Sequence, residues 1–246
     1  MSLVAQPSGL VPAYHPSGEI RSIAHKGLIP PGFSVAINKG QPVFLFRGTG
    51  AVVQGGVTIP ANQVVLVPFN TAITGNAGSL LNTQANVAAQ SILGVFAGCE
   101  YYDALGFPQE SNFWPAGQAC FPGTVVTAFV WQDPLLEYTI QTDAALTSAA
   151  TTIGDSIARY DGLQGFLNVN TMGNAANPPG VGLSQATFQG GAVATATVIA
   201  ATGSQGQLQI SKVDPTILNQ TDADAFLQLQ VRIALPQTAA AYVSKA

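Results

Sequence analysis

The chain of 246 residues carries only eight Lys and Arg and twelve Asp and Glu residues, together 8% of the sequence, whereas about 25% is usual in soluble domains. The formal net charge is −4 and the basic residues are scattered singly, so the clustered cations that neutralise phosphates are missing and we expect no nucleic-acid partner. No run of about eighteen or more apolar residues occurs, so we expect no transmembrane helix and no membrane partner.

Apolar residues nevertheless make up 47% of the chain. Solubility normally depends on surface charge, and exposed apolar patches usually mark contacts, so this composition indicates a surface that partner proteins cover. A free-standing β protein is the alternative. The first residues, MSLVAQPSGLVPAYHPSGEI, lack the basic and continuous apolar regions of a secretory signal, so we expect synthesis and retention in a cytoplasm.

Residues 1–32 are rich in proline and glycine. Proline fixes φ and lacks a donor, so the segment predicts an extended arm rather than a helix or a central strand. It is more apolar than a solvated tail, and we predict that it docks on a neighbour rather than staying disordered. The apolar residues expected at this interface are Leu3, Val4, Leu10, Val11, Tyr14 and Ile20.

Residues 33–246 are predicted to form a β-rich body. Apolar and polar residues alternate in 33–38, and a short β-branched and aromatic run follows in 41–48, which is typical of strands. Residues 123–133 are apolar on both faces, so they predict a strand that is covered on both sides. Trp131 on this strand is a further predicted interface residue.

The clearest strand pattern lies in residues 225–235, where apolar residues alternate with Gln and Arg. Residues 206–212 repeat this alternation, so the two segments are predicted to pair as an antiparallel ribbon. One helix is predicted over 143–160 from apolar spacing after Asp143, although Thr and Gly residues weaken it. The sequence predicts a mainly β fold with at most one or two short helices, an antiparallel sandwich or barrel with a jelly roll as one option, and a possible subdivision near 143–170.

The central stretch ILGVFAGCEYYDALGFPQESNFWPAG, residues 92–117, gathers aromatic and acidic residues. Tyr and Trp combine a large apolar face with a polar tip, which suits half-buried seams. We interpret the stretch as core and interface rather than a catalytic pocket. Its predicted interface residues are Tyr101, Tyr102, Phe113 and Trp114.

No catalytic, cofactor-binding or metal-binding residue is predicted. The two histidines, His15 and His25, both lie in the proline-rich segment, away from a rigid scaffold that catalysis or metal binding would need. Cys99 and Cys120 could form one disulfide, but a reducing cytosol favours free, buried thiols.

Two other function classes stay open. Glu100, Asp103 and Glu110 could form the carboxylate pair of a glycosidase. Tyr101, Tyr102 and Trp114 could stack sugars in a carbohydrate-binding or adhesin protein. Acids that face solvent beside packed aromatics are the commoner arrangement at surfaces and interfaces, and we favour it.

The sequence resembles structural proteins of tailed-bacteriophage heads, and the nearest group is the capsid decoration, or cement, proteins. The resemblance is spread over most of the chain and rests on the segments LVAQPSGLVPAYHPSGEIRS, KGQPVFL, ILGVFAGCEYYD, SNFWPAG, WQDPLLEYTIQ and AFLQLQVRIALPQ. The resemblance implies a β-rich, cofactor-free protein on the outer surface of an icosahedral virion. Its partners would be the major capsid protein and further copies of itself, as dimers or trimers at symmetry axes. It transfers no individual site residue, so the interface residues above are predicted from pattern alone.

Overall fold

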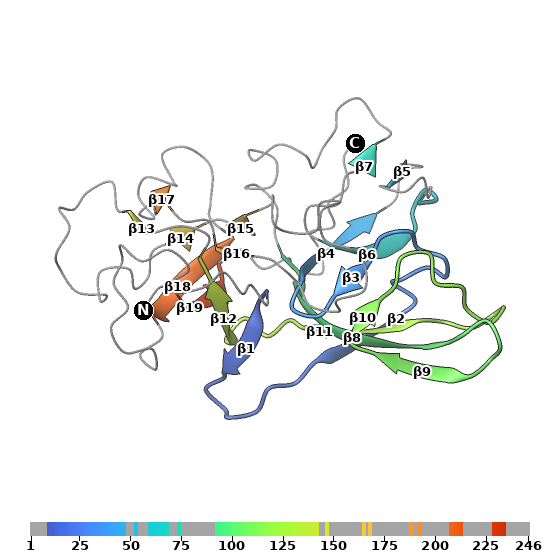
Figure 1. Cartoon of the computed structure of the whole chain (residues 1–246), viewed down its shortest axis with the longest axis horizontal. Helices are drawn as coiled ribbons and strands as arrows, with labels where there is room; N and C mark the ends of the chain where they lie inside the picture. Colours follow the sequence, from blue (N-terminus) through green and yellow to red (C-terminus); the bar gives the residue numbers. More distant parts are fainter. Residues whose placement is uncertain are drawn as a thin grey trace, which may run out of the picture.

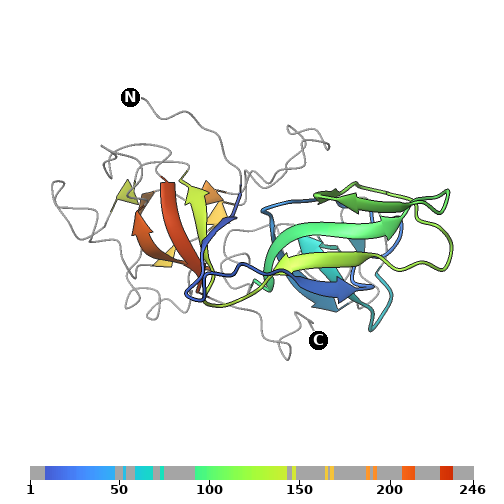
Figure 2. The same ribbon diagram turned by 90° about the horizontal axis from the view of Figure 1, so that it is seen from below.

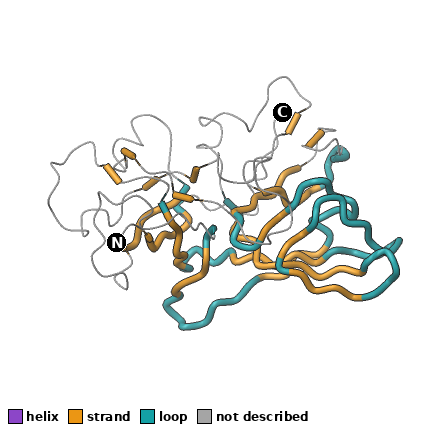
Figure 3. The backbone as a smooth tube through the Cα atoms, in the orientation of Figure 1, coloured by secondary structure: helices purple, strands orange, loops and turns teal. Residues whose placement is uncertain are grey.

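The computed structural model describes residues 9–47, 52–53, 59–68, 73–74, 92–142, 146–147, 164–165, 167–168, 187–188, 191–192, 207–213 and 228–234. Within these ranges every regular element is a β-strand and no helix occurs (Figure 3). The main sheets are antiparallel throughout. The mainly β, sandwich-like antiparallel fold predicted from the sequence is therefore confirmed.

Two main sheets occupy opposite ends of the long axis in both views (Figures 1 and 2). The five-stranded sheet has the order β1 (Val11–Tyr14), β12 (Glu137–Gln141), β19 (Gln228–Ile233), β18 (Leu208–Val213) and β14 (Gln164–Gly165). The six-stranded sheet has the order β2 (Ile23–Lys26), β11 (Thr127–Trp131), β8 (Gly94–Tyr102), β4 (Pro42–Arg47) and β6 (Val64–Pro68), and β9 (Pro108–Ser111) pairs with β8 as well.

Four short pairs complete the described strands. They are β3 (Ile37–Asn38) with β10 (Phe113–Trp114), β5 (Val52–Val53) with β7 (Ile73–Thr74), β13 (Leu146–Thr147) with β17 (Gly191–Ala192), and β15 (Leu167–Asn168) with β16 (Thr187–Phe188). The pair of β13 and β17 is parallel. The predicted helix over 143–160 is wrong at Leu146–Thr147, which form β13, and its other residues lie outside the described ones, as does most of the possible subdivision near 143–170.

Residues 9–26, which we call the strap, provide one edge strand of each main sheet: β1 in the five-stranded sheet and β2 in the six-stranded sheet. Within the strap β1 pairs with β12 and β2 pairs with β11. Because β11 and β12 are themselves consecutive in the chain, the strap runs antiparallel to one continuous segment as it passes from one sheet to the other (Figure 1). The described part of the predicted arm is thus extended, as expected, but it pairs with its own chain.

Side chains reinforce this pairing at residues 132–136, the connector between β11 and β12. The Nε2 atom of His25 lies 2.8 Å from Oε1 of Gln132. The Nε2 atom of His15 lies 3.3 Å from a carboxylate oxygen of Asp133. His25 therefore hydrogen-bonds the strap to the connector, whereas the buried Nε2 of His15 lies close to Asp133 without a hydrogen-bond partner. Both histidines pack at the joint of strap and connector.

The core of the six-stranded sheet is built around Trp114, whose side chain is fully buried. The indole Nε1–H donates a hydrogen bond to the carbonyl oxygen of Phe33 at 3.1 Å. The Tyr101 ring meets the indole edge-on, with centroids 5.4 Å apart and planes at 75°, an arrangement that adds to apolar burial. Trp114 therefore closes β10 over the sheet and satisfies its one polar atom inside the core.

The alternation predicted at the C-terminal end is confirmed. Leu229, Val231 and Ile233 on β19 are buried while the residues between them are half-buried. Ile210 of β18 stands opposite Val231, and the two strands pair antiparallel as predicted. Strand β11 is covered on one face by the core, where Ala128 and Val130 are buried, and only half-covered on the other.

The five-stranded sheet also holds a charged pair. The Glu137 carboxylate is almost fully buried, and Arg232 donates to it from Nε at 3.0 Å and from Nη2 at 2.5 Å. A buried carboxylate is costly unless it is paired and hydrogen-bonded. The Arg21–Glu19 pair on the strap, by contrast, is largely exposed on both sides, where such pairs contribute little.

We expect Arg232→Ala to lower the free energy of unfolding by about 2–3 kcal/mol, because it leaves the buried Glu137 carboxylate unpaired. The matched change Arg21→Ala should cost less than about 0.5 kcal/mol. Urea unfolding followed by circular dichroism measures both. Equal losses from the two variants would contradict this difference in burial.

Gly94 marks a close approach between strands in the six-stranded sheet. A Cβ atom there would overlap the backbone carbonyl oxygen of Trp131 and lie 2.8 Å from the Val130 side chain. We expect Gly94→Ala to destabilise the protein by about 3 kcal/mol in urea unfolding. The control is Gly117→Ala, where the new side chain meets open space and only the left-handed φ of 72° is unfavourable, so we expect a loss of about 1 kcal/mol. A larger loss for Gly117→Ala than for Gly94→Ala would contradict this and show that β8 can shift away from β11.

Candidate binding surfaces

Large apolar side chains that are exposed in the described part of the chain gather in two places. The strap surface consists of Val11, Tyr14, Ile20 and Ile23 of the strap with Leu135 of the connector. The tip surface lies at the far end of the β8–β9 hairpin and consists of Tyr102, Leu105, Phe107, Phe121 and Val125. Exposed contiguous apolar surface of this kind usually marks a contact with another molecule.

The tip surface stands on a tightly bonded turn between β8 and β9. One carboxylate oxygen of Asp103 accepts hydrogen bonds from the N–H groups of Leu105 and Phe107 at 2.9 and 3.0 Å. The other accepts one from the Gln109 side-chain amide at 3.0 Å. These hydrogen bonds lower the pKa of the Asp103 carboxyl, and the bond from the Phe107 N–H has the largest effect. The turn therefore holds Leu105, 79% exposed, and Phe107, 60% exposed, outward without a core beneath them.

A second segment supports the hairpin from the side. The Phe121 N–H donates a hydrogen bond to the Tyr102 carbonyl oxygen at 3.1 Å. Next to it, the backbone of Cys120 forms an isolated antiparallel β-bridge with that of Asp103. The Phe121 ring lies close to Gly106, whose φ of +87° favours glycine and where a Cβ would be 3.3 Å from the ring. Residues far apart in the chain thus form one surface.

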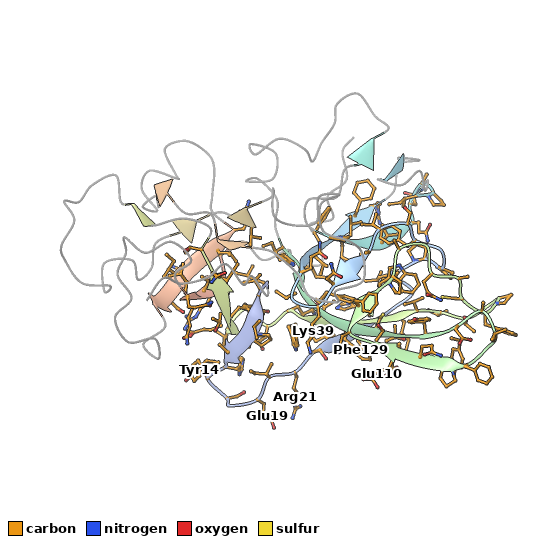
Figure 4. The ribbon with its side chains drawn as sticks, viewed as in Figure 1. Tyr14, Glu19, Arg21, Lys39, Glu110 and Phe129 are labelled. Carbon is orange, nitrogen blue, oxygen red and sulfur yellow. The ribbon has the colours of Figure 1, made fainter. Side chains whose placement is uncertain are left out.

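A pocket of about 300 Å³ opens beside the tip surface. It is lined by Glu100, Tyr101, Tyr102, Pro108, Gln109, Glu110, Val125 and Thr127. Glu100 stands directly opposite Glu110 on β9 and opposite Thr127 on β11, and directly opposed residues point to the same face of a sheet. The two carboxylates therefore share the floor of the pocket, and Glu110 projects away from the ribbon in Figure 4.

The structure describes nine of the eleven predicted interface residues and places them in three environments. Leu3 and Val4 lie outside the described residues. The exposed members are Val11, Tyr14, Ile20 and Tyr102, and the half-buried ones are Tyr101, Phe113 and Trp131. Leu10 and Trp114 are fully buried inside the chain, where they pack in the core.

The burial of Trp114 also removes the three-aromatic sugar platform that the sequence suggested. Trp114 packs against Tyr101 and has no exposed surface, while Tyr102, next along β8, points to the opposite face. Only Tyr102 offers an exposed ring at the pocket. Glu100 and Glu110 lie opposite each other, as the alternative hypothesis of a glycosidase requires. The Asp103 carboxylate instead accepts hydrogen bonds within the turn.

Sequence reasoning did not predict six residues of these two surfaces: Ile23, Leu105, Phe107, Phe121, Val125 and Leu135. Their apolar character is typical of core positions, and each follows a short distance after a turn residue or a strand end. For Leu105 a signal was present, because Asp103 and Gly106 on either side of it are typical of a tight turn whose side chains face solvent.

The described residues contain no group of three His, Cys, Asp or Glu side chains that could hold a metal ion. Cys99 and Cys120 are both free thiols. Among the described residues no helix is long and apolar enough to cross a membrane. Comparison of the chain with protein-family models, with curated proteins and with solved structures finds no match.

Burial makes the stability of the protein depend on pH through Cys99. Burial, and to a lesser degree the neighbouring Cys120, raises the pKa of the Cys99 thiol from 9.0 to about 12. Below pH 9.0 both folded and unfolded chains keep this proton, but between 9.0 and about 12 only the unfolded chain loses it. Stability contributed by the buried thiol is therefore lost as pH rises through this window.

We expect the free energy of unfolding to fall by about 1 kcal/mol per pH unit between pH 9.5 and 11 on account of Cys99. The Cys99→Ala variant, which cannot ionise there, should show a shallower decrease, with the remainder due in part to Tyr138, whose pKa is also raised by burial. Urea unfolding at several pH values checks this. An identical slope in both proteins would contradict it.

Proposed function

We propose that the chain is a non-enzymatic structural protein of a tailed-phage virion, which binds the outer surface of an icosahedral capsid and bridges its capsomers. The observation that supports this most directly is the presence of two exposed apolar surfaces: the strap surface, which runs along the edge strands β1 and β2, and the tip surface beside the β8–β9 hairpin. A bridging protein needs at least two contact surfaces, while a protein that binds one small ligand needs one. The sequence resemblance to head decoration proteins supplies the partner, the major capsid protein.

The energetics of bridging suit this chain. When two contacts are linked, formation of one raises the effective concentration for the other, so the overall affinity is high even where each single contact binds weakly. Apolar and main-chain contacts depend less on salt than ion pairs do, which fits a chain with only 8% charged residues. Further copies of the chain, as dimers or trimers, would add more linked contacts to the shell.

The strap pairing decides how this proposal can be tested. Deleting residues 1–25 would remove β1 and most of β2, the edge strands of both sheets, so loss of binding in that variant would report on folding. Point changes of exposed side chains avoid this difficulty. Leu105→Ser with Phe107→Ser alters the tip surface, and Tyr14→Ser with Ile20→Ser alters the strap surface.

We expect purified protein to bind empty heads of the phage that encodes it and to raise their melting temperature. Each double variant should weaken binding to the heads by about a hundredfold, because one of two linked contacts is lost. The control variant Asn112→Ser, exposed but outside both surfaces, should bind as the unaltered protein does. Co-sedimentation and calorimetry measure these effects, and absence of binding by the unaltered protein would reject the proposal.

A further inference from the structure

The pocket beside the tip surface has an unbalanced charge. Glu100 and Glu110 face each other across neighbouring strands, and like charges directly opposite each other are destabilising. In the described part of the chain neither carboxylate has an ion-pair partner; the pairs that occur join His15 to Asp133, Arg21 to Glu19 and Arg232 to Glu137.

No cation of the described residues forms an ion pair with these two carboxylates. The sequence contains no Lys or Arg between Arg47 and Arg159, so the hairpin and the segment beside it carry only acidic charge. Lys26 stands opposite Thr127, which stands opposite Glu100, so Lys26 lies on the same face of the sheet two strands from Glu100, but it forms no ion pair with either carboxylate. Lys39 sits over the Trp131 ring, 5.9 Å from its centroid.

The surroundings of the pocket are apolar and pre-formed. Tyr102 and Val125 line it and also belong to the tip surface, which continues to Leu105, Phe107 and Phe121. The hydrogen bonds of Asp103 fix the turn. The volume of about 300 Å³ is at the lower limit for ligand pockets, so it suits one long side chain better than a large ligand.

We propose that the tip surface binds an exposed segment of a protein partner in which an arginine is flanked by apolar residues, with the guanidinium group in the pocket between Glu100 and Glu110. A planar guanidinium can donate to both carboxylates and stack on an aromatic ring, and Tyr102 provides the ring. The apolar neighbours of the arginine would cover Leu105 and Phe107. The inference rests on the proposed function in so far as the partner is the capsid subunit.

The test uses the full chain labelled with ¹⁵N and two synthetic peptides, acetyl-Ile-Arg-Ile-amide and the same peptide with citrulline in place of arginine. Citrulline keeps the shape of arginine and removes its charge. We expect the arginine peptide to shift the backbone amide signals of Glu100, Tyr102 and Glu110 saturably, with at least about fivefold tighter binding than the citrulline peptide. Raising the salt concentration should narrow this difference.

The Glu100→Gln/Glu110→Gln variant should bind the arginine peptide about fivefold more weakly, and Glu19→Gln on the strap should not change the affinity. Both acids of the pocket are exposed, so the variant keeps its fold, which the dispersion of its amide spectrum verifies. Equal binding of the two peptides, unchanged affinity of the double variant, or shifts of the same amides by neutral maltotriose but not by the arginine peptide would each overturn the inference.

Empty phage heads separate this inference from the proposed function. If heads bind the unaltered protein and the Glu100→Gln/Glu110→Gln variant equally well, the arginine site is overturned while the proposed function stands. If heads bind neither protein and the arginine peptide still binds the pocket as expected, the proposed function fails while the pocket's preference for arginine is supported.

Discussion

The structure depends on the antiparallel pairing of the strap with the segment that runs from β11 through the connector to β12. One extended stretch supplies the edge strand of both sheets, so the register of one sheet is linked to that of the other. The hydrogen bond of His25 with Gln132 lies at the crossing point, and His15 packs beside Asp133 there. Both histidines are therefore used in joining the sheets, and the strap surface lies along this joint.

The few charges of the chain are divided between structure and surface in an uneven way. Arg232 neutralises the buried Glu137, Arg21 pairs with Glu19, and Lys39 lies over an aromatic ring. The described tip of the β8–β9 hairpin is left with acids and apolar side chains alone. A low content of charge thus has a local consequence: among the described residues, the hairpin tip that carries no cation holds the most exposed apolar side chains, Leu105 and Phe107.

The parts of the fold that local patterns determine were predictable, and the parts that depend on distant pairing were not. Strict alternation identified β18 and β19 and their pairing, since period two places every apolar residue on one face. Nothing in residues 9–26 states that β1 and β2 pair with strands more than a hundred residues away. Trp114 was assigned to a surface because its partners, Phe33 and Tyr101, come from other elements, and Leu105 and Phe107 were overlooked because apolar residues usually indicate a core.

An exposed apolar tip would normally favour self-association, and the acids beside it oppose this. If two copies met tip to tip, Glu100 and Glu110 of each would approach the same charges of the other, at a cost in electrostatic energy. A partner that brings a cation removes that cost and covers the same apolar side chains. Discrimination of this kind needs both an attractive and a repulsive component, and the tip surface together with the two carboxylates of the adjoining pocket would supply both. The same carboxylates that would favour the proposed basic partner would therefore also oppose tip-to-tip association of two copies.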